Sequence, residues 1–206
     1  MHQTKAADIV VVGAGPEGLC AALAAARLGA KTLLVTNRPS LGGNSSSEIR
    51  VWTRGATGGG NLFAEEMGTW GAFKMRNLYV NPEGNPVLWD DVLLDLCLQE
   101  ENLSLLLNTH ISGVEMDAQK LRGVTGFQLN SEIQFTLQGS FFIDCTGDGT
   151  LGALCGVPFS MGKESSAAFG ESLAPMEGDP STQGQSLLYY VKKSPEKVTF
   201  IPPAYA

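Results

Sequence analysis

Three glycines with the spacing Gly13-x-Gly15-x-x-Gly18 lie between an apolar run at residues 8–12 and a helical pattern at residues 19–28. Glycine permits a tight turn, lets a phosphate approach the backbone, and lets a helix pack closely on a strand. The free N–H groups and positive dipole end of such a helix attract phosphate. The sequence therefore predicts a site for a dinucleotide pyrophosphate. A glycine turn that binds nothing is the alternative, and the strand before it and the helix after it favour the ligand.

A second group of residues with catalytic potential follows a glycine pair in the next loop. Glu48, Arg50, Trp52 and Arg54 carry the charges and the aromatic ring of this group. A solvated loop edge explains them equally well, so both interpretations stay open. The serines at residues 45–47 have no base at a spacing that indicates nucleophilic catalysis.

We expect the polar residues in the second half of the chain to have structural roles and not catalytic ones. Asp144 and Asp148 resemble a carboxylate pair, but we expect Asp148 to face a cofactor or a helix N-terminus and Asp144 to order the backbone. His110 follows a strand and is expected to be an ordinary hydrogen-bonded group. Core filling explains Cys145 better than redox chemistry does.

These residues need a frame of strands and helices to bring them together. Residues 31–35 form a second apolar run, which predicts a βαβ unit with parallel strands and a right-handed crossover. The loop at residues 36–60 is long for a compact domain, and such long loops usually have a function, so we expect it to line the ligand. Ligands of open α/β sheets bind at the carboxyl ends of strands. The glycine turn and the glycine-bearing segment 144–149 are therefore expected to face one crevice.

The remaining pattern predicts further elements. The helical part is a helix over residues 62–75, a turn at residues 81–86, and a helix that is capped by Asp90 or Asp91 and ends near Glu101. The strands are a short one at residues 103–107, an antiparallel β-meander over residues 111–138 that serves as a crossover, a buried strand at residues 141–143, and a strand-like segment at residues 186–192.

Composition excludes several classes of protein. The chain has 206 residues, 43% of them hydrophobic, which is enough for a sizeable core. Its net charge is −7 and it has no run of Lys and Arg, so we expect no nucleic-acid partner. Pro16, Glu17 and glycines interrupt the apolar stretch at residues 9–26, so we expect neither a membrane span nor a signal peptide.

The cysteines indicate a reducing compartment. They are Cys20, Cys97, Cys145 and Cys155. All four lie in apolar contexts without a Cys-x-x-Cys pair, so we expect no metal site and no disulfide framework. A soluble cytoplasmic protein fits this composition best.

Four motifs in order resemble those of FAD-dependent oxidoreductases with a glutathione-reductase-like Rossmann domain. They are Gly-Ala-Gly-Pro-Glu-Gly at residues 13–18, Leu-Gly-Gly-Asn-Ser-Ser-Ser-Glu-Ile-Arg at residues 41–50, Leu-Leu-Leu-Asn-Thr-His-Ile at residues 105–111, and Asp-Cys-Thr-Gly-Asp-Gly at residues 144–149. The resemblance implies an α/β fold with a parallel sheet and a β-meander crossover. It also implies an FAD-binding domain at residues 1–156, followed by the start of a substrate domain at residues 157–206.

The resemblance assigns FAD-binding roles to individual residues. The pyrophosphate would lie on Gly13, Gly15, Pro16 and Gly18; the phosphates and ribityl chain would approach Gly42, Gly43, Asn44 and Ser45; the adenine would meet the backbone of Ile111; and Thr146, Gly147 and Asp148 would close over the cofactor.

One departure from this pattern concerns the adenosine ribose. Such folds usually end the second strand with an acidic residue that accepts the ribose hydroxyl protons. Thr36, Asn37 and Arg38 stand there in this chain. A neutral side chain can still bind the ribose, although more weakly. The arginine suggests NADP as an alternative, which ranks below FAD because the Gly42-Gly43 element and the meander belong to the flavin pattern.

The resulting functional hypothesis is an FAD-dependent oxidoreductase that moves hydride or electrons through its flavin, with a small-molecule substrate whose identity the sequence does not indicate. The chain has the length of an N-terminal portion or of a truncated reading frame, so we expect it to be inactive on its own, with its catalytic residues outside it. Two alternatives remain. One is an NAD-using enzyme similar to thiazole synthase, and the other is a noncatalytic dinucleotide-binding fragment.

Overall fold

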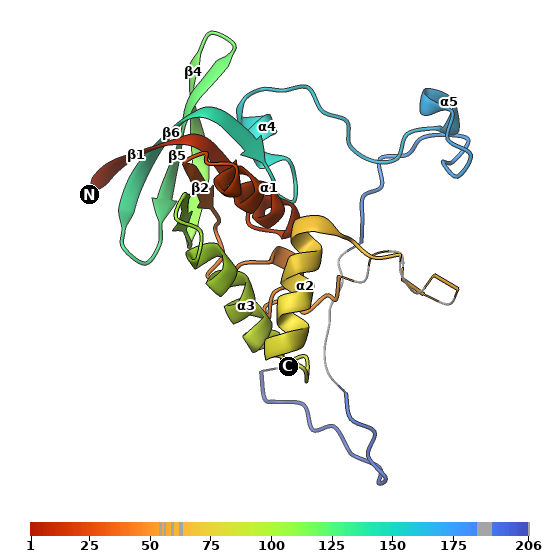
Figure 1. Cartoon of the computed structure of the whole chain (residues 1–206). Coiled ribbons are helices and arrows are strands. Elements are labelled where there is room, and N and C mark those ends of the chain that lie inside the picture. The colour runs from red at the N-terminus through yellow and green to blue at the C-terminus, as the bar shows by residue number, and fades with distance from the viewer. Residues whose placement is uncertain (54, 56, 59, 62–63, 185–190, 206) are drawn as a thin grey trace. The chain divides into compact units, whose positions relative to one another are not determined.

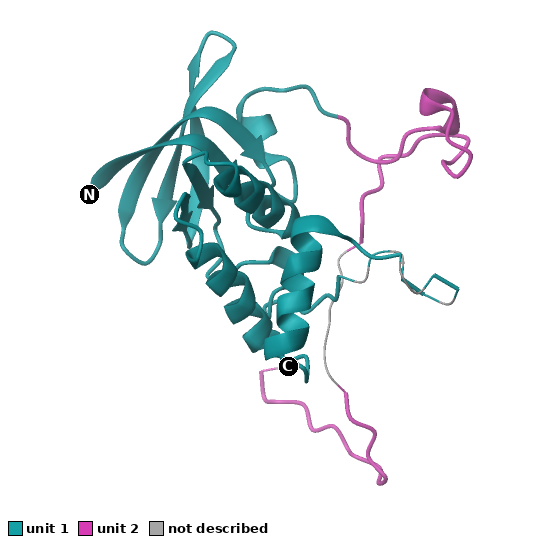
Figure 2. Cartoon of the chain, viewed as in Figure 1, with its two compact units in different colours: residues 1–159 teal, residues 160–206 magenta. Residues whose placement is uncertain are grey.

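The computed structural model describes residues 1–206 except 54, 56, 59, 62–63, 185–190 and 206. The chain divides into two compact units, Met1–Phe159 and Ser160–Ala206 (Figure 2). The first unit contains strands β1 to β6 and helices α1 to α4, together with the 3-10 turn η1. The second unit contains the short helix α5 (Ser166–Phe169), and an antiparallel bridge joins Lys163 to Asp179 within it.

The first unit is built on one six-stranded sheet with the order β3-β2-β1-β6-β5-β4 (Figure 1). Its strands are β1 (His2–Val12), β2 (Thr32–Val35), β3 (Leu103–Leu106), β4 (Thr109–Asp117), β5 (Lys120–Gln128) and β6 (Ile133–Asp144). Strands β3, β2, β1 and β6 are mutually parallel, whereas β4 and β5 run antiparallel to their neighbours. This topology confirms the predicted α/β fold with a parallel sheet and a meander crossover.

The first βαβ unit forms where the sequence predicts it. Helix α1 (Pro16–Arg27) starts directly after the glycine turn, with proline in its first turn, where no intrahelical N–H bond is lost. The helix ends before Gly29, whose φ of 91° lies in the left-handed region that glycine adopts most easily. Strand β2 then pairs in parallel with β1, so that Val12 lies opposite Val35.

The two faces of the sheet bury different side chains. Val11 and Leu34 belong to a core cluster with residues of α1, α2 (Gly68–Val80) and α3 (Pro86–Leu98). Figure 1 shows these three helices gathered beside the sheet. The opposite face contributes to a second cluster, in which Val10, Val12, Leu33 and Val35 join Ile111, Val124, Phe135 and Leu137 of the meander and Leu151 of α4 (Thr150–Leu154). Residues of the meander and of α4 therefore share the core on the face of the sheet that the larger helices do not cover.

Helices α2 and α3 both begin at residues other than those predicted. The predicted helix over 62–75 is replaced by α2, which starts at Gly68 and is fixed by the buried side chains of Trp70 and Phe73. Residues 62–63 lie outside the described part of the chain. Helix α3 starts at Pro86 rather than after Asp90 or Asp91, because the Asn85 side chain accepts a hydrogen bond from the N–H of Val87 (2.9 Å).

Strands β1 and β6 are longer than predicted. The sequence places a separate strand at residues 141–143, but in the structure these residues continue the last strand of the meander. Strand β1 extends back to His2 and pairs with β6 from Gln134 to Asp144, which makes the extension possible. The prediction that residues 141–143 are buried is wrong at Phe141, which is 70% exposed. The predicted strand at residues 186–192 lies outside the described residues up to 190, and Val191 and Lys192 have no regular structure.

Candidate functional site

The carboxyl ends of β1, β2 and β6 meet at one edge of the sheet. Val12, the last residue of β1, lies opposite Val35 on one side and Asp144 on the other. The N–H of Gly13 donates to the carbonyl of Val35 (2.8 Å), and the N–H of Cys145 donates to the carbonyl of Val12 (2.8 Å). The glycine turn is thus held between the end of β2 and the loop after β6.

Two of the three turn glycines are required by the fold itself. Gly13 has a φ of 101°, and a Cβ there would overlap the carbonyl oxygen of Cys145. A Cβ on Gly18 would overlap the carbonyl oxygen of Gly13, so the start of α1 can approach β1 only with glycine at this position. These contacts match the turn and packing roles predicted for the first and third glycines of the motif.

Gly15 differs from the other two. Its φ of −66° and ψ of −179° are open to any residue, and it lies at the N-cap of α1. Among the described residues, a Cβ there would meet within 4 Å only side-chain atoms of Glu17, the nearest being Oε2 at 2.7 Å. The end of a flexible side chain can move aside. The folded chain therefore shows no need for glycine at residue 15.

The loop after β2 returns to this turn. The N–H of Gly42 donates to the carbonyl of Ala14 (2.8 Å), and a Cβ on Gly43 would lie 3.1 Å from the Cα of Gly15. The short helix η1 (Gly43–Ser45) follows, with Ser45 buried and Asn44 exposed. Ser45 donates its hydroxyl to the carbonyl of Gly42 (2.8 Å). The structure thus brings residues 42–45 beside the glycine turn.

The position of this loop depends on an aspartate that sequence reasoning misassigned. The N–H of Ser47 donates to Oδ1 of Asp90 (2.8 Å), which ties the loop to the middle of α3. The sequence suggested Asp90 as a helix cap, and nothing in the spacing of residues 47 and 90 indicates the contact. Asp90 is therefore a supporting residue of the site that only the structure reveals.

Asp144 organises the loop after β6. Its Oδ1 accepts hydrogen bonds from the N–H (3.0 Å) and the hydroxyl (2.7 Å) of Thr146, and its Oδ2 accepts one from the N–H of Gly152 (2.8 Å). The hydroxyl oxygen of Thr146 accepts from the N–H of Thr150 (2.7 Å) at the start of α4. Partial burial raises the pKa of Asp144, but these hydrogen bonds outweigh it and hold the pKa below its usual value. Gly147 and Asp148 are exposed at the tip of this loop.

The end of β2 lies against the start of β4. The N–H of Thr36 donates to the carbonyl of Leu106 (3.0 Å), and the N–H of Thr109 donates to the carbonyl of Thr36 (2.8 Å). Thr36 is buried, whereas Asn37 and Arg38 are exposed. Ile111 is buried two residues further along β4. The residues predicted for ribose and adenine therefore lie on neighbouring segments of the chain.

The other catalytic candidates that the structure describes lie in the loop after η1. Arg50 donates from Nε to the carbonyl of Ser47 (3.0 Å), and Glu48 and Trp52 are exposed. Arg54 lies outside the described residues. Across the described chain, no group of three or more His, Cys, Asp or Glu side chains could hold a metal ion.

The cysteine thiols are poor candidates for nucleophiles. Burial raises the pKa of Cys97 to about 12 and, helped by nearby carboxylates, also raises the pKa of Cys145. A thiol with a raised pKa carries little of the reactive thiolate at neutral pH. These environments agree with core filling as the role of both residues.

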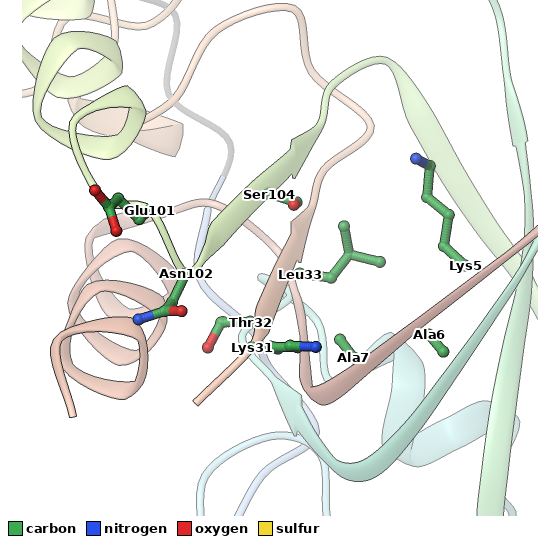
Figure 3. Close-up of a pocket in the computed structure, with 9 residues that line it drawn as sticks. All are labelled: Lys5, Ala6, Ala7, Lys31, Thr32, Leu33, Glu101, Asn102 and Ser104. Carbon is green, nitrogen blue, oxygen red and sulfur yellow. The ribbon is translucent and has the colours of Figure 1, made fainter. Parts of the chain in front are cut away.

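A hollow of about 350 Å³ lies elsewhere on the sheet, near the amino ends of β2 and β3. Figure 3 shows Lys5 and Glu101 on opposite sides of it, with Leu33 between them. It is lined by Lys5, Ala6, Ala7, Lys31, Thr32, Leu33, Glu101, Asn102 and Ser104, none of which is a predicted site residue. Ligands of parallel sheets bind at the carboxyl ends of the strands, so the glycine turn is the candidate site and this hollow is not.

Comparison with known proteins gives a family match and several partial ones. A family model described as FAD dependent oxidoreductase matches residues 8–200. Dihydrolipoyl dehydrogenase of Manduca sexta is 58% identical over 40 residues, which is 19% of this chain and 8% of that protein. No helix of the described residues is long and apolar enough to cross a membrane.

Two solved structures illustrate the partial matches. Glycerol-3-phosphate dehydrogenase from Bacillus halodurans, complexed with FAD, is 18% identical with a TM-score of 0.49, and the match covers 73% of this chain and 36% of that one. A geranylgeranyl bacteriochlorophyll reductase-like protein from Thermoplasma acidophilum is 19% identical with a TM-score of 0.49, covering 78% and 45%. The chain therefore spans less than half the length of these proteins.

Proposed function

Because the chain belongs to the FAD-dependent oxidoreductase family, we propose that the carboxyl edge of its sheet holds FAD and that the whole protein oxidises or reduces a small molecule through the flavin. FAD supplies the hydride and electron transfer when it is bound. The residues of this chain position the cofactor. The pyrophosphate lies on Gly13, Gly15, Pro16 and Gly18, the ribityl side near Gly42, Gly43, Asn44 and Ser45, the ribose at Thr36, Asn37 and Arg38, and the adenine at the backbone of Ile111, while Thr146, Gly147 and Asp148 cover the cofactor.

The main support for this proposal is that the fold does not require a glycine at residue 15. The fold explains Gly13 and Gly18, but it leaves Gly15 without a structural reason. A glycine that neither the backbone angles nor the packing requires is explained by something that must approach its Cα from outside the chain. A phosphate at the start of α1 is such a group, because the helix dipole and the first N–H groups attract an anion there.

The domain organisation and the location belong to the same proposal. We propose that residues 1–156 bind FAD and that residues 157–206 begin a substrate domain; the compact units divide three residues later, after Phe159. Because the chain spans less than half the length of these proteins, we propose that residues 1–206 alone show no turnover. The four free cysteines support a reducing, cytoplasmic compartment.

The identity of the released cofactor tests the proposal. Purified protein should show flavin absorbance, and chromatography after heat release should recover FAD. Recovery of FMN alone, of NAD or an NAD-derived adduct, or of no cofactor from a folded chain would contradict it. The last two results would favour the thiazole-synthase-like enzyme and the noncatalytic module respectively.

A glycine variant links the cofactor to the site. We expect Gly15→Val to lose FAD and stay folded, because its side chain enters the space that phosphate needs and displaces only Glu17 inside the chain. Gly71→Ala is the matched control, since it adds a methyl group within α2 in ordinary contact with the carbonyl of Glu66 (3.4 Å). Full FAD retention in Gly15→Val, measured as the flavin-to-protein absorbance ratio, would place the pyrophosphate elsewhere.

A further inference from the structure

The Glu17 carboxylate lies over the backbone that the pyrophosphate is proposed to approach. Glu17 is the acidic residue in the first turn of α1. Its Oε2 lies 2.7 Å from the position that a Cβ on Gly15 would take. The side chain therefore turns back over Gly15, and the space left open by the missing Cβ is bordered by a negative charge.

The start of α1 attracts this carboxylate for the same reason that it attracts phosphate. Gly15 caps the helix without any side-chain hydrogen bond, so the first N–H groups are not satisfied by a side-chain cap. An anion near such a terminus is stabilised by the helix dipole. Glu17 is an anion that the chain itself places there.

The backbone of the returning loop also comes close to Gly15. A Cβ added to Gly43 would lie only 3.1 Å from the Cα of Gly15, so the two glycines leave little room between them. The charge of Glu17 also acts beyond its own turn, because it contributes to raising the pKa of Cys20 on α1 and of Cys145 after β6, where burial is the larger cause. A phosphate at Gly15 therefore meets the charge of Glu17 at close range.

We infer that Glu17 lowers the affinity of the site for dinucleotides, because its carboxylate competes with the cofactor pyrophosphate for the start of α1. This inference rests on the proposed function. Cofactor binding then requires the Glu17 side chain to swing away from Gly15, and the repulsion between carboxylate and pyrophosphate persists after it moves. The glycine turn admits the cofactor, and Glu17 sets how tightly the turn retains it.

Neutralising Glu17 tests the inference. Glu17→Gln keeps the size of the side chain and removes its charge, and we expect it to bind FAD and ADP about fivefold more tightly than the parent. This corresponds to about 1 kcal/mol, the interaction of two unit charges about 4 Å apart in water. ADP serves as a probe because it carries adenosine and pyrophosphate without the flavin. Isothermal titration calorimetry measures both dissociation constants.

Two further variants separate charge competition from other effects. Glu101→Gln is the matched control, because it changes the net charge equally beside the hollow at the amino end of β3, and it should leave both constants unchanged. Glu17→Ala should also tighten binding. If Glu17→Gln alone tightened it, a new hydrogen bond from the amide would explain the gain and the competition would be refuted.

The outcomes distinguish this inference from the proposed function. If the parent binds FAD and both Glu17 variants bind it equally or more weakly, the inference fails and the cofactor site stands. If the parent binds neither FAD nor ADP at millimolar concentration, the proposed function fails, and the inference fails with it. Lower thermal stability of the Glu17 variants without ligand, together with tighter binding, supports the competition, since it shows that the carboxylate stabilises the helix start that the cofactor must share.

Discussion

Replacing Asp144 by Asn should weaken the fold by removing the clamp on the loop after β6. One carboxylate accepts three hydrogen bonds, two from Thr146 and one from Gly152. An asparagine keeps one acceptor oxygen and turns an NH2 group toward a donor, so at least one of the three bonds is lost. Hydrogen bonds to charged groups contribute about 1.5–3 kcal/mol each, and exposure of Asp144 favours the lower end. We expect a loss of about 1–2 kcal/mol in the free energy of unfolding at pH 7.

The pH dependence of this loss identifies the charge as its cause. The pKa of Asp144 is lower in the folded chain than its usual value, because the hydrogen bonds outweigh the effect of partial burial. A carboxyl with a lowered folded pKa stabilises fully above its unfolded pKa and loses this stabilisation as the pH falls through the folded pKa. The difference between parent and Asp144→Asn should therefore be smaller at about pH 3 than at pH 7.

Urea unfolding followed by circular dichroism measures both quantities. Asp148→Asn is the control, because Asp148 is exposed in the same loop, and we expect it to change stability by less than about 0.5 kcal/mol. Equal stability of Asp144→Asn and the parent at pH 7 would show that the clamp contributes nothing. A difference that stays constant down to about pH 3 would attribute the loss to packing instead of to the carboxylate charge.

Four further substitutions follow from the contacts described above. Gly18→Ala should lower the free energy of unfolding by more than about 3 kcal/mol or prevent folding, because its Cβ would overlap the carbonyl oxygen of Gly13. Thermal melting measures this loss, and stability equal to that of the parent would refute the close packing of α1 on β1. Asn37→Asp should tighten FAD binding by about 1 kcal/mol in a fluorescence titration, because a charged acceptor binds ribose hydroxyls more strongly, and a large loss of affinity would place the ribose elsewhere. Thr36→Glu should instead destabilise the fold, because residue 36 is buried. Asn85→Ala should lower the unfolding free energy by about 1 kcal/mol through loss of the α3 cap, as measured in urea, and no change would mean that Pro86 alone starts the helix.

The sequence predicts the centre of the fold because local patterns determine it. The glycine turn follows the apolar residues Val10, Val11 and Val12 and precedes a clear helical pattern. The strand, the turn and the helix can therefore be predicted from residue types alone. The start of α3 could also have been found, since Asn85 before Pro86 is a cap followed by a favoured first residue. The turn residues around it suggested a loop instead.

Other features depend on contacts between distant residues and leave no local signal. Phe141 lies in an apolar run that suggests burial, but it is exposed because the strand extends along β1 and presents alternate residues to different faces. The contact of Ser47 with Asp90 and the direction of Glu17 depend on how elements and side chains meet in space. Loop length predicted that residues 36–60 line the ligand, but only the family resemblance indicated that residues 42–45 are the part that approaches the glycine turn.

The long pairing of β1 with β6 has a consequence for the order of folding during synthesis. His2 pairs with Gln134 and Val12 with Asp144, so β1 lies next to a strand made more than a hundred residues later. Translation adds about 5–20 residues per second, so the edge of β1 that pairs with β6 stays unpaired for on the order of ten seconds during synthesis. Unpaired apolar strand edges invite association between chains. The β1-α1-β2 unit can form early, but the nascent chain needs protection along that edge until residue 144 has left the ribosome.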